Sequence, residues 1–280
     1  MLSLGIEIGP ELVARQATWF APEHQPFLVA KDTASTIGAT PLRGRLPAEL
    51  RDTFEIYTLP VELVCVLLCE EEFNDLGRTA RAELVRHQIR LGREVIPSVR
   101  SAPADLRERV SERADGHRFV WWPSLLQGNE ELILGAYLRF GRRHSRHFEV
   151  PESLWASTRA ALPGARALAG TFPLASGPNC FGTVMAAAGR SAAAETWMLQ
   201  QPFEDWLSAA AVLGGTDTDP STVLVGRSAD GLAQHAPVTI GGGYALHKPS
   251  QGWMSPRKVL TAREVIASAR RQGRRLADTR

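Results

Sequence analysis

Three consecutive glycines, Gly241–Gly243, place the strongest constraint on the fold, because they separate two short segments of β-type sequence. Ala236–Ile240 precedes the glycines and Tyr244–Leu246 follows them, which is the pattern of a tight β-hairpin. His235 stands just before the first segment, and His247 ends the second, twelve residues later. A hairpin that turns at the glycines brings both histidines to the same end of a small antiparallel sheet.

A second feature is Cys180, which stands where a turn sequence gives way to a helical one. Ser176-Gly177-Pro178 predicts the turn, and the alanine-rich segment that ends at Gly189 is typical of a helix with a glycine C-cap. A thiol at a helix N-terminus lies at the positive end of the helix dipole, which favours the thiolate. Nucleophilic catalysis also needs an imidazole and a group that orients it, and His235 and His247 supply these types. The alternative interpretation of Cys180 is an inert cysteine in an apolar core.

Both motifs resemble those of the NlpC/P60 cysteine hydrolases, a compact branch of the papain-like fold. Members of that family begin a helix with the motif Asp-Cys-Ser-Gly-Leu-Val and carry two histidines on a hairpin. The matching stretches here are Asn179–Val184 and His235–His247, and the interval between the two histidines is the usual one in the family. Three positions depart from the family pattern: Asn179 replaces an acidic residue, Phe181 replaces a serine, and Pro237 removes a backbone donor from the first strand.

The resemblance implies a thiol hydrolase that cleaves an amide or peptide bond through an acyl-enzyme on Cys180. In that role His235 is the base and His247 orients it, while Asn179 and Ser176 are candidates for binding substrate or the oxyanion. The resemblance implies a small peptide or amide as substrate, with no metal and no cofactor. Two alternatives use the same fold: an acyltransferase or amide-forming enzyme with the same acyl-enzyme, and a catalytically inactive interaction protein.

The resemblance covers about residues 150–260, and a chain of 280 residues is long enough for about two domains. The sequence therefore predicts an α+β protein whose residues 1–150 form an α/β or mainly helical region of unknown role. Residues 151–280 are expected to form a papain-like, NlpC/P60-type domain in which a cysteine-led helix packs on a small antiparallel sheet. The boundary is indicated by Pro151, which suits the start of a helix, and by the basic segment Gly141–His147, which predicts a solvated loop.

Helical spacing is clearest over residues 61–96, with a break near Asn74–Gly77 that predicts two helices. Cys65 and Cys69 lie four residues apart in the first of these, where we expect them to be core residues, since the further ligands of a metal site are missing. The sequence also predicts helices over residues 129–140, 203–213 and 259–276, and one over 151–169 that is interrupted near Pro163–Gly164.

The composition limits the partners. Lys and Arg number 32 against 30 Asp and Glu, and a net charge of +2 is too small to favour nucleic acid or an anionic membrane. The best apolar run, Val61–Cys69, is nine residues long, too short to cross a membrane, and the N-terminus lacks the pattern of a signal peptide. Three cysteines, an odd number, do not make a disulfide framework. These features predict a cytoplasmic protein with reduced thiols.

Overall fold

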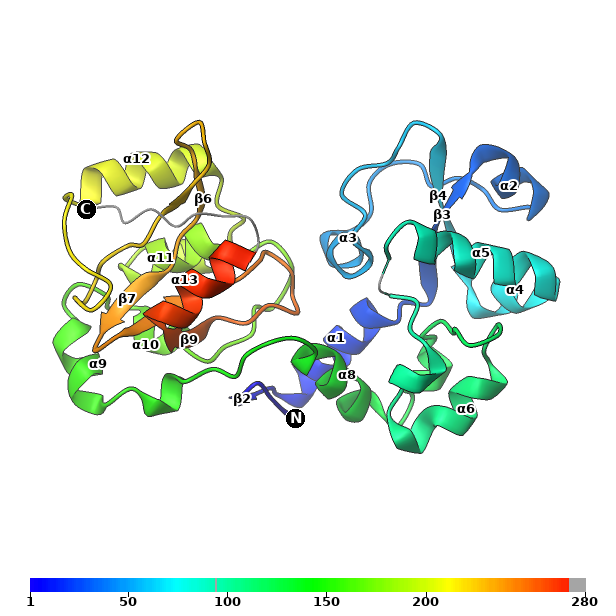
Figure 1. The fold of residues 1–280 in the computed structure, drawn as a ribbon, viewed down its shortest axis with the longest axis horizontal. Coiled ribbons are helices and arrows are strands. Elements are labelled where there is room, and N and C mark those ends of the chain that lie inside the picture. The colour runs from blue at the N-terminus through cyan, green and yellow to red at the C-terminus, as the bar shows by residue number, and fades with distance from the viewer. Residues whose placement is uncertain (94, 272–280) are drawn as a thin grey trace. The chain divides into compact units, whose positions relative to one another are not determined.

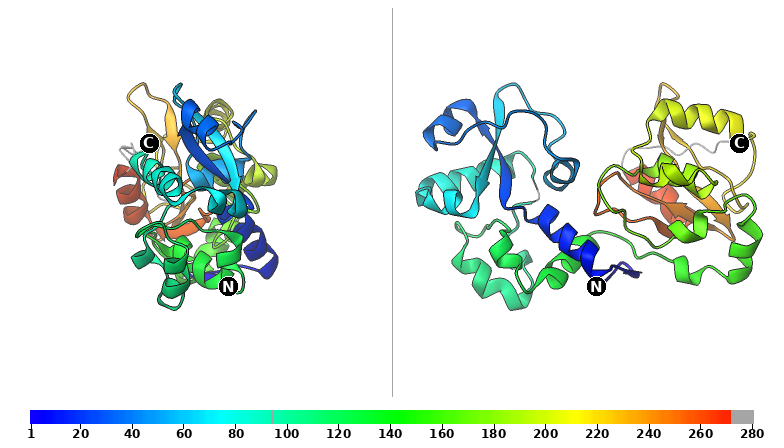
Figure 2. Two further views of the ribbon diagram at one scale, coloured as in Figure 1. Left: turned by 90° about the vertical axis from the view of Figure 1, so that its right-hand side faces the viewer. Right: turned by 180° about the vertical axis from the view of Figure 1, so that it is seen from behind.

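The chain divides into two compact units in a computed structural model that describes residues 1–93 and 95–271. The first unit consists of Met1 and Gly9–Phe140, and the second combines Leu2–Ile8 with the chain from Gly141 onward. The division falls after Phe140, whereas the sequence places the boundary near residue 150. Each unit mixes helices with short antiparallel strands, as expected for the α+β class (Figures 1 and 2).

The first unit is built around a hairpin of two strands. β3 (His24–Ala30) and β4 (Leu63–Cys69) pair antiparallel along their whole length. Phe27 and Val66 lie opposite each other in this pair and share an apolar core with Trp122. The helices of the unit are α1 (Pro10–Phe20), α2 (Lys31–Thr36), α3 (Ala48–Phe54), α4 (Glu70–Asp75), α5 (Arg78–Arg90), α6 (Arg107–Glu112), α7 (Pro123–Leu126) and α8 (Glu130–Arg139), with 3-10 turns at Val99–Ser101 and Ala104–Leu106.

The helix predicted over residues 61–69 is wrong, because most of this segment forms β4. Both faces of the strand are buried: Val66 belongs to one apolar core and Cys65 to a second. A strand buried on both faces has a continuous apolar sequence, which periodicity does not distinguish from a buried helix. The break predicted after this segment is confirmed, since α4 ends at Asp75 and α5 begins at Arg78.

The second unit contains a three-stranded antiparallel sheet between helices (Figure 1). Its strands are β7 (Val238–Gly241), β8 (Tyr244–His247) and β9 (Lys258–Thr261), with β8 in the centre. Leu246 belongs to the core that also contains α11 (Cys180–Ala187), whereas its neighbour Ala245 packs with Val265 of α13 (Ala262–Arg271). Because adjacent side chains of a strand point to opposite faces, α11 and α13 cover opposite faces of the sheet.

Several shorter elements complete the second unit: the strand pairs β1 (Leu2–Ser3) with β2 (Ile6–Glu7) and β5 (Gly226–Arg227) with β6 (Ala233–His235), the helices α9 (Glu152–Thr158), α10 (Ala165–Leu168) and α12 (Gln200–Ala210), and 3-10 turns at His147–Glu149 and Ser191–Glu195. The helix predicted from residue 259 begins only at Ala262, because Lys258–Thr261 is a strand, and its last part, 272–276, lies outside the described residues. Within residues 1–93 and 95–271, no helix is both long and apolar enough to cross a membrane.

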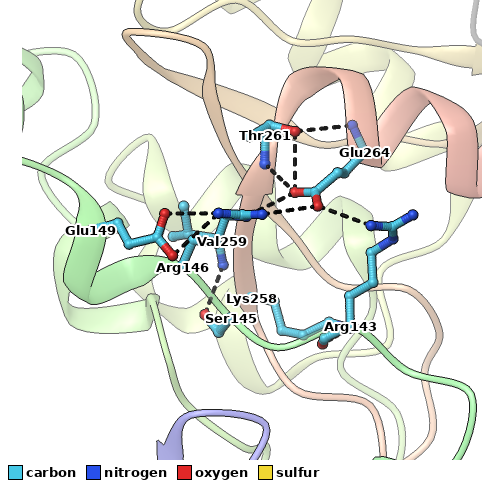
Figure 3. A network of polar contacts seen from close by, with 8 residues as sticks. All are labelled: Arg143, Ser145, Arg146, Glu149, Lys258, Val259, Thr261 and Glu264. Carbon is cyan, nitrogen blue, oxygen red and sulfur yellow. Dashed lines mark hydrogen bonds and ion pairs between the residues drawn. The ribbon is translucent and has the colours of Figure 1, made fainter.

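The basic segment after Gly141 is a loop with several exposed residues, as the sequence predicts, but one buried residue attaches it to β9 (Figure 3). Ser145 is fully buried, and its hydroxyl accepts a hydrogen bond of 3.1 Å from the backbone N–H of Val259. Arg146 lies between two carboxylates, at 2.9 Å from Glu149 and 3.0 Å from Glu264 (Figure 3). The bond to Val259 joins the segment to the strand that forms one edge of the sheet, and Glu264 ties it to α13.

Candidate active site

Two buried histidines meet at the end of the predicted hairpin. His235 is the last residue of β6 and His247 the last of β8, and each is no more than 3% exposed. The Nε2 atom of His235 lies 3.1 Å from the Nδ1 atom of His247, within hydrogen-bond distance. The rings are nearly perpendicular, at 84°, with their centroids 5.0 Å apart. The twelve-residue interval therefore does bring the two imidazoles into direct contact.

The glycine turn makes this contact possible. Gly241, Gly242 and Gly243 all have positive φ angles, of 99°, 59° and 79°, a region that side chains with a Cβ rarely adopt. A Cβ on Gly242 would also lie 2.7 Å from a methyl group of Leu154. Pro237 stands between β6 and β7, outside either strand, so its missing N–H removes no bond from the sheet.

The surroundings of His247 keep its ring neutral. Burial lowers the pKa of His247 well below its ordinary value of 6.5, and the charge of the neighbouring His235 adds to this effect. The ammonium groups of Lys258 and Lys248 lower the same pKa further, and Lys258 lies directly opposite His247 in the β8–β9 pair. A neutral imidazole has one ring nitrogen that accepts a hydrogen bond. His247 can therefore accept at Nδ1 from a protonated Nε2 of His235.

Cys180 is the first residue of α11, as the sequence predicts. Asn179 caps the helix: its side-chain oxygen accepts a bond of 3.0 Å from the N–H of Gly182, and its amide donates to the carbonyl of Met198 at 2.7 Å. Cys180 is 7% exposed and belongs to the same buried core as Ala236, the residue next to His235. Because α11 also packs against β8, the structure gathers the cysteine helix and both histidine-bearing strands in one unit.

The helix that carries Cys180 is held by very close backbone packing. A Cβ on Gly182 would lie 2.3 Å from the carbonyl oxygen of Ala193 and 3.1 Å from that of Thr196. A Cβ on Gly164 would meet the carbonyl oxygen of Ala186 at 2.3 Å. Only glycine fits at either position, so two backbone contacts fix where the helix lies.

Ser176 and Asn179, the candidates for binding substrate or the oxyanion, both contact neighbouring backbone. The hydroxyl of Ser176 accepts a bond of 3.2 Å from the N–H of Trp253. The side-chain oxygen of Asn179 caps α11, and its nitrogen is bonded to the carbonyl of Met198. Next to Ser176, the N–H of Gly177 donates to the carbonyl of Gln251 at 2.9 Å. The turn before Cys180 is thus attached to the loop that follows His247.

Sequence reasoning missed Lys248, which is completely buried although it directly follows His247. Its ammonium group donates hydrogen bonds to the backbone carbonyls of Ser250, Gly252 and Ser255, at 2.6, 3.3 and 2.9 Å. Lysine is almost never fully buried, and nothing in the local pattern of the sequence indicates it here.

The other two cysteines lie in the first unit. Cys65 is buried in β4, where burial raises the pKa of its thiol to about 11 despite the nearby charge of Arg93. Cys69 caps α4, and its sulfur accepts a bond from the N–H of Glu72. Burial in apolar surroundings disfavours a thiolate at Cys65. At Cys69, three glutamates in the first turn of α4 counter the positive end of the helix dipole. Among the residues that the structure describes, no three His, Cys, Asp or Glu side chains gather as they would to hold a metal ion.

Two cavities lie away from this site. One, of about 820 Å³, lies beside α11 and α12 in the second unit, where Val184, Trp206 and Val238 contribute to its wall. The other, of about 500 Å³, lies between α2 and α5 in the first unit and includes His87. Neither is lined by Cys180 or by the two histidines, so neither offers a space that opens directly on the thiol.

Comparison of the chain with protein-family models, with curated proteins and with solved structures finds no match.

Proposed function

We propose that this chain is a cysteine hydrolase of the NlpC/P60 type that cleaves an amide or peptide bond in a small substrate. The observation that carries the proposal is the 3.1 Å contact between His235 Nε2 and His247 Nδ1. It supplies a base and an orienting residue in the unit where Cys180 begins a helix. A purely structural pair of buried histidines has no need of a cysteine at a helix N-terminus in the same core.

The roles of the two imidazoles follow from their protonation. The Nε2 atom of His235 is hydrogen-bonded to His247, so Nδ1 is the ring nitrogen that exchanges a proton with the Cys180 thiol. When His235 takes up that proton, both of its ring nitrogens carry hydrogen, and Nε2 needs an acceptor. His247, held neutral by burial, is that acceptor. The contact therefore stabilises the protonated His235 that a thiolate–imidazolium pair requires.

The reaction then proceeds in two steps. The Cys180 thiolate attacks the carbonyl carbon, and the first amides of α11, at the positive end of the helix dipole, favour the oxyanion. The C–N bond breaks as His235 gives its proton to the leaving amine, which leaves a thioester on Cys180. Water then loses a proton to His235 and attacks the thioester. This step releases a carboxylic acid and restores the thiol.

The pH dependence of thiol alkylation tests the proposal without a known substrate. We expect iodoacetamide to modify Cys180 at pH 6 faster than Cys65 or Cys69, as measured by peptide mass mapping of the folded protein. In His235→Ala the alkylation midpoint should move to that of an ordinary thiol, about 8.5. His247→Gln should keep part of the reactivity at low pH, since a neutral amide can still accept from His235.

Faster labelling of Cys65 or Cys69 in the folded protein would overturn the assignment of the nucleophile. An unchanged midpoint in His235→Ala would remove His235 from the mechanism. Once an amide substrate is identified, His235→Ala should lower turnover by about 10²–10⁴-fold, the contribution of one positioned acid–base group. Both variants are compared with wild type per folded molecule, because a role in folding alone lowers only the amount of active protein.

A further inference from the structure

The loop after His247 is folded around the ammonium group of Lys248. This side chain is 0% exposed, and its three hydrogen bonds to the carbonyls of Ser250, Gly252 and Ser255 match the three donors of an ammonium group. The loop also closes on itself. The N–H of Ser250 donates to the hydroxyl of Ser255 at 3.1 Å, and the N–H of Ser255 donates to the carbonyl of Gly252 at 3.0 Å. The loop Lys248–Ser255 is therefore a compact frame with a cation at its centre.

The same loop holds the turn that leads into Cys180. The carbonyl of Gln251 accepts from the N–H of Gly177 at 2.9 Å, and the N–H of Trp253 donates to the hydroxyl of Ser176 at 3.2 Å. Trp253 is itself 0% exposed, so the loop is anchored in the core as well as to the turn.

We propose that Lys248 is a positioning residue, whose buried ammonium group fixes the turn before Cys180 relative to His247. This role matters for catalysis only if Cys180 is the nucleophile, so the inference rests on the proposed function. One end of the frame continues directly from His247, and its middle is bonded to Ser176 and Gly177, a few residues before the thiol. Without the ammonium group, three carbonyls that all face one point have no common donor, and the loop has no reason to keep this shape.

Two buried lysines allow a matched experiment. Lys248→Met removes the charge and keeps the length of the side chain. Lys258→Met makes the same change at another buried lysine of the same unit, whose Nζ atom donates to the carbonyl of Arg143 at 3.2 Å, away from the loop. Lys258 also lowers the pKa of His247 more strongly than Lys248 does. A purely electrostatic effect on His247 is therefore expected to be larger in Lys258→Met.

The first readout is the pH midpoint of Cys180 alkylation by iodoacetamide. We expect Lys248→Met to move the midpoint toward 8.5 and to lower the rate at pH 6 by at least about tenfold, because a displaced thiol no longer pairs with His235. Lys258→Met should move the midpoint less than Lys248→Met does. A shift in Lys258→Met that equals or exceeds that of Lys248→Met, or no shift in a folded Lys248→Met protein, overturns the positioning role.

The second readout is hydrogen exchange at the amides of Gly177 and Trp253, which does not depend on catalysis. Lys248→Met should expose both amides to exchange, whereas Lys258→Met should not. If Cys180 of the wild type titrates as an ordinary thiol, the proposed function fails, yet the exchange result still reports whether Lys248 holds the turn. Unchanged exchange in Lys248→Met overturns the inference even if Cys180 is reactive.

Should Lys248→Met not fold, Ser176→Ala tests the same connection without changing any charge. It removes the hydroxyl that accepts from the Trp253 N–H. We expect a smaller shift of the alkylation midpoint in the same direction, together with faster exchange at Trp253. A wild-type midpoint with faster exchange means that the turn is held by the loop without affecting the thiol, which rejects the positioning role.

Discussion

At the scale of single residues, burial keeps His247 neutral and thereby makes the stability of the protein depend on pH. Its pKa lies well below 6.5 in the folded protein because the ring is buried and faces positive charge. An unfolded chain has no such constraint, and its histidine takes up a proton near pH 6.5. As pH falls below that value, the unfolded state binds a proton that the folded state does not bind. Through His247, the free energy of unfolding therefore decreases as the pH falls.

We predict that His247→Gln makes the free energy of unfolding less dependent on pH. Between pH 7 and 5, the wild type should lose up to about 1.4 kcal/mol per pH unit through His247, and the variant should lack this loss. Denaturant unfolding of both proteins at several pH values measures the difference. His87 and His147, whose pKa values are also lowered by burial, contribute equally to both proteins.

If His247→Gln keeps the pH dependence of the wild type, the ring of His247 is not held neutral in the folded state, and the proposed acceptor for the His235 proton is lost.

At the scale of elements, α11 is positioned by close backbone contacts that only a glycine allows. The carbonyl oxygens of Ala193 and Thr196 approach Gly182 so closely that no Cβ fits there without movement of the helix or of the turn beside it. Within a helix, replacing glycine with alanine ordinarily stabilises by up to about 1 kcal/mol. The close approach predicts the opposite sign at Gly182.

We predict that Gly182→Ala destabilises the second unit by about 1–3 kcal/mol, the usual cost of overpacking. The matched control is Gly135→Ala in α8, another glycine inside a helix. The atoms nearest to its Cβ would be those of the Arg139 guanidinium group, at 3.0 Å, and that flexible group can move. Gly135→Ala should therefore leave stability unchanged or raise it, as measured by urea unfolding. Equal effects of the two substitutions would contradict the packing described for α11.

The sequence predicts those elements whose partners lie nearby in the chain. The β7–β8 hairpin is closed by three glycines, so the contact between His235 and His247 follows from local rules. The start of α11 at Cys180 follows from its turn and cap. The sequence does not predict β9, because its identity as a strand depends on pairing with β8 across the Lys248 loop. That loop is shaped by a buried ammonium group, and an irregular backbone of this kind has no periodic signal.

At the scale of the whole molecule, the first residues of the chain belong to the second unit. Leu2–Ile8 forms a small hairpin, and the carbonyl of Leu4 accepts a bond of 2.8 Å from the N–H of Ser145. Leu4, Ile6 and Ile8 are each no more than 2% exposed. The sequence does not predict this association, since it joins segments separated by the entire first unit. It also means that neither Phe140 nor residue 150 is a complete boundary for the second unit.

The last prediction concerns this hairpin and follows from two of its side chains. Ile6 is 1% exposed, whereas Leu2 is 67% exposed in the paired strand. Ile6→Ala should destabilise the second unit by about 2–5 kcal/mol, because it leaves a cavity in a packed core. For a unit of this size the loss lowers its melting temperature by roughly 5–15 °C. Leu2→Ala should change stability by less than about 0.5 kcal/mol.

Differential scanning calorimetry measures both variants, and the Gly182→Ala variant identifies the transition of the second unit. We expect Ile6→Ala to move the transition that Gly182→Ala moves and to leave the other in place. If Ile6→Ala instead moves the transition of the first unit, the hairpin stabilises the first unit, and its assignment to the second unit is contradicted. If one transition contains both units and shifts in every variant, the two units unfold as a single cooperative body. In that case a fragment that begins at residue 141 should be unstable because the first unit is missing. Adding Leu2–Ile8 back as a peptide should then not restore its stability.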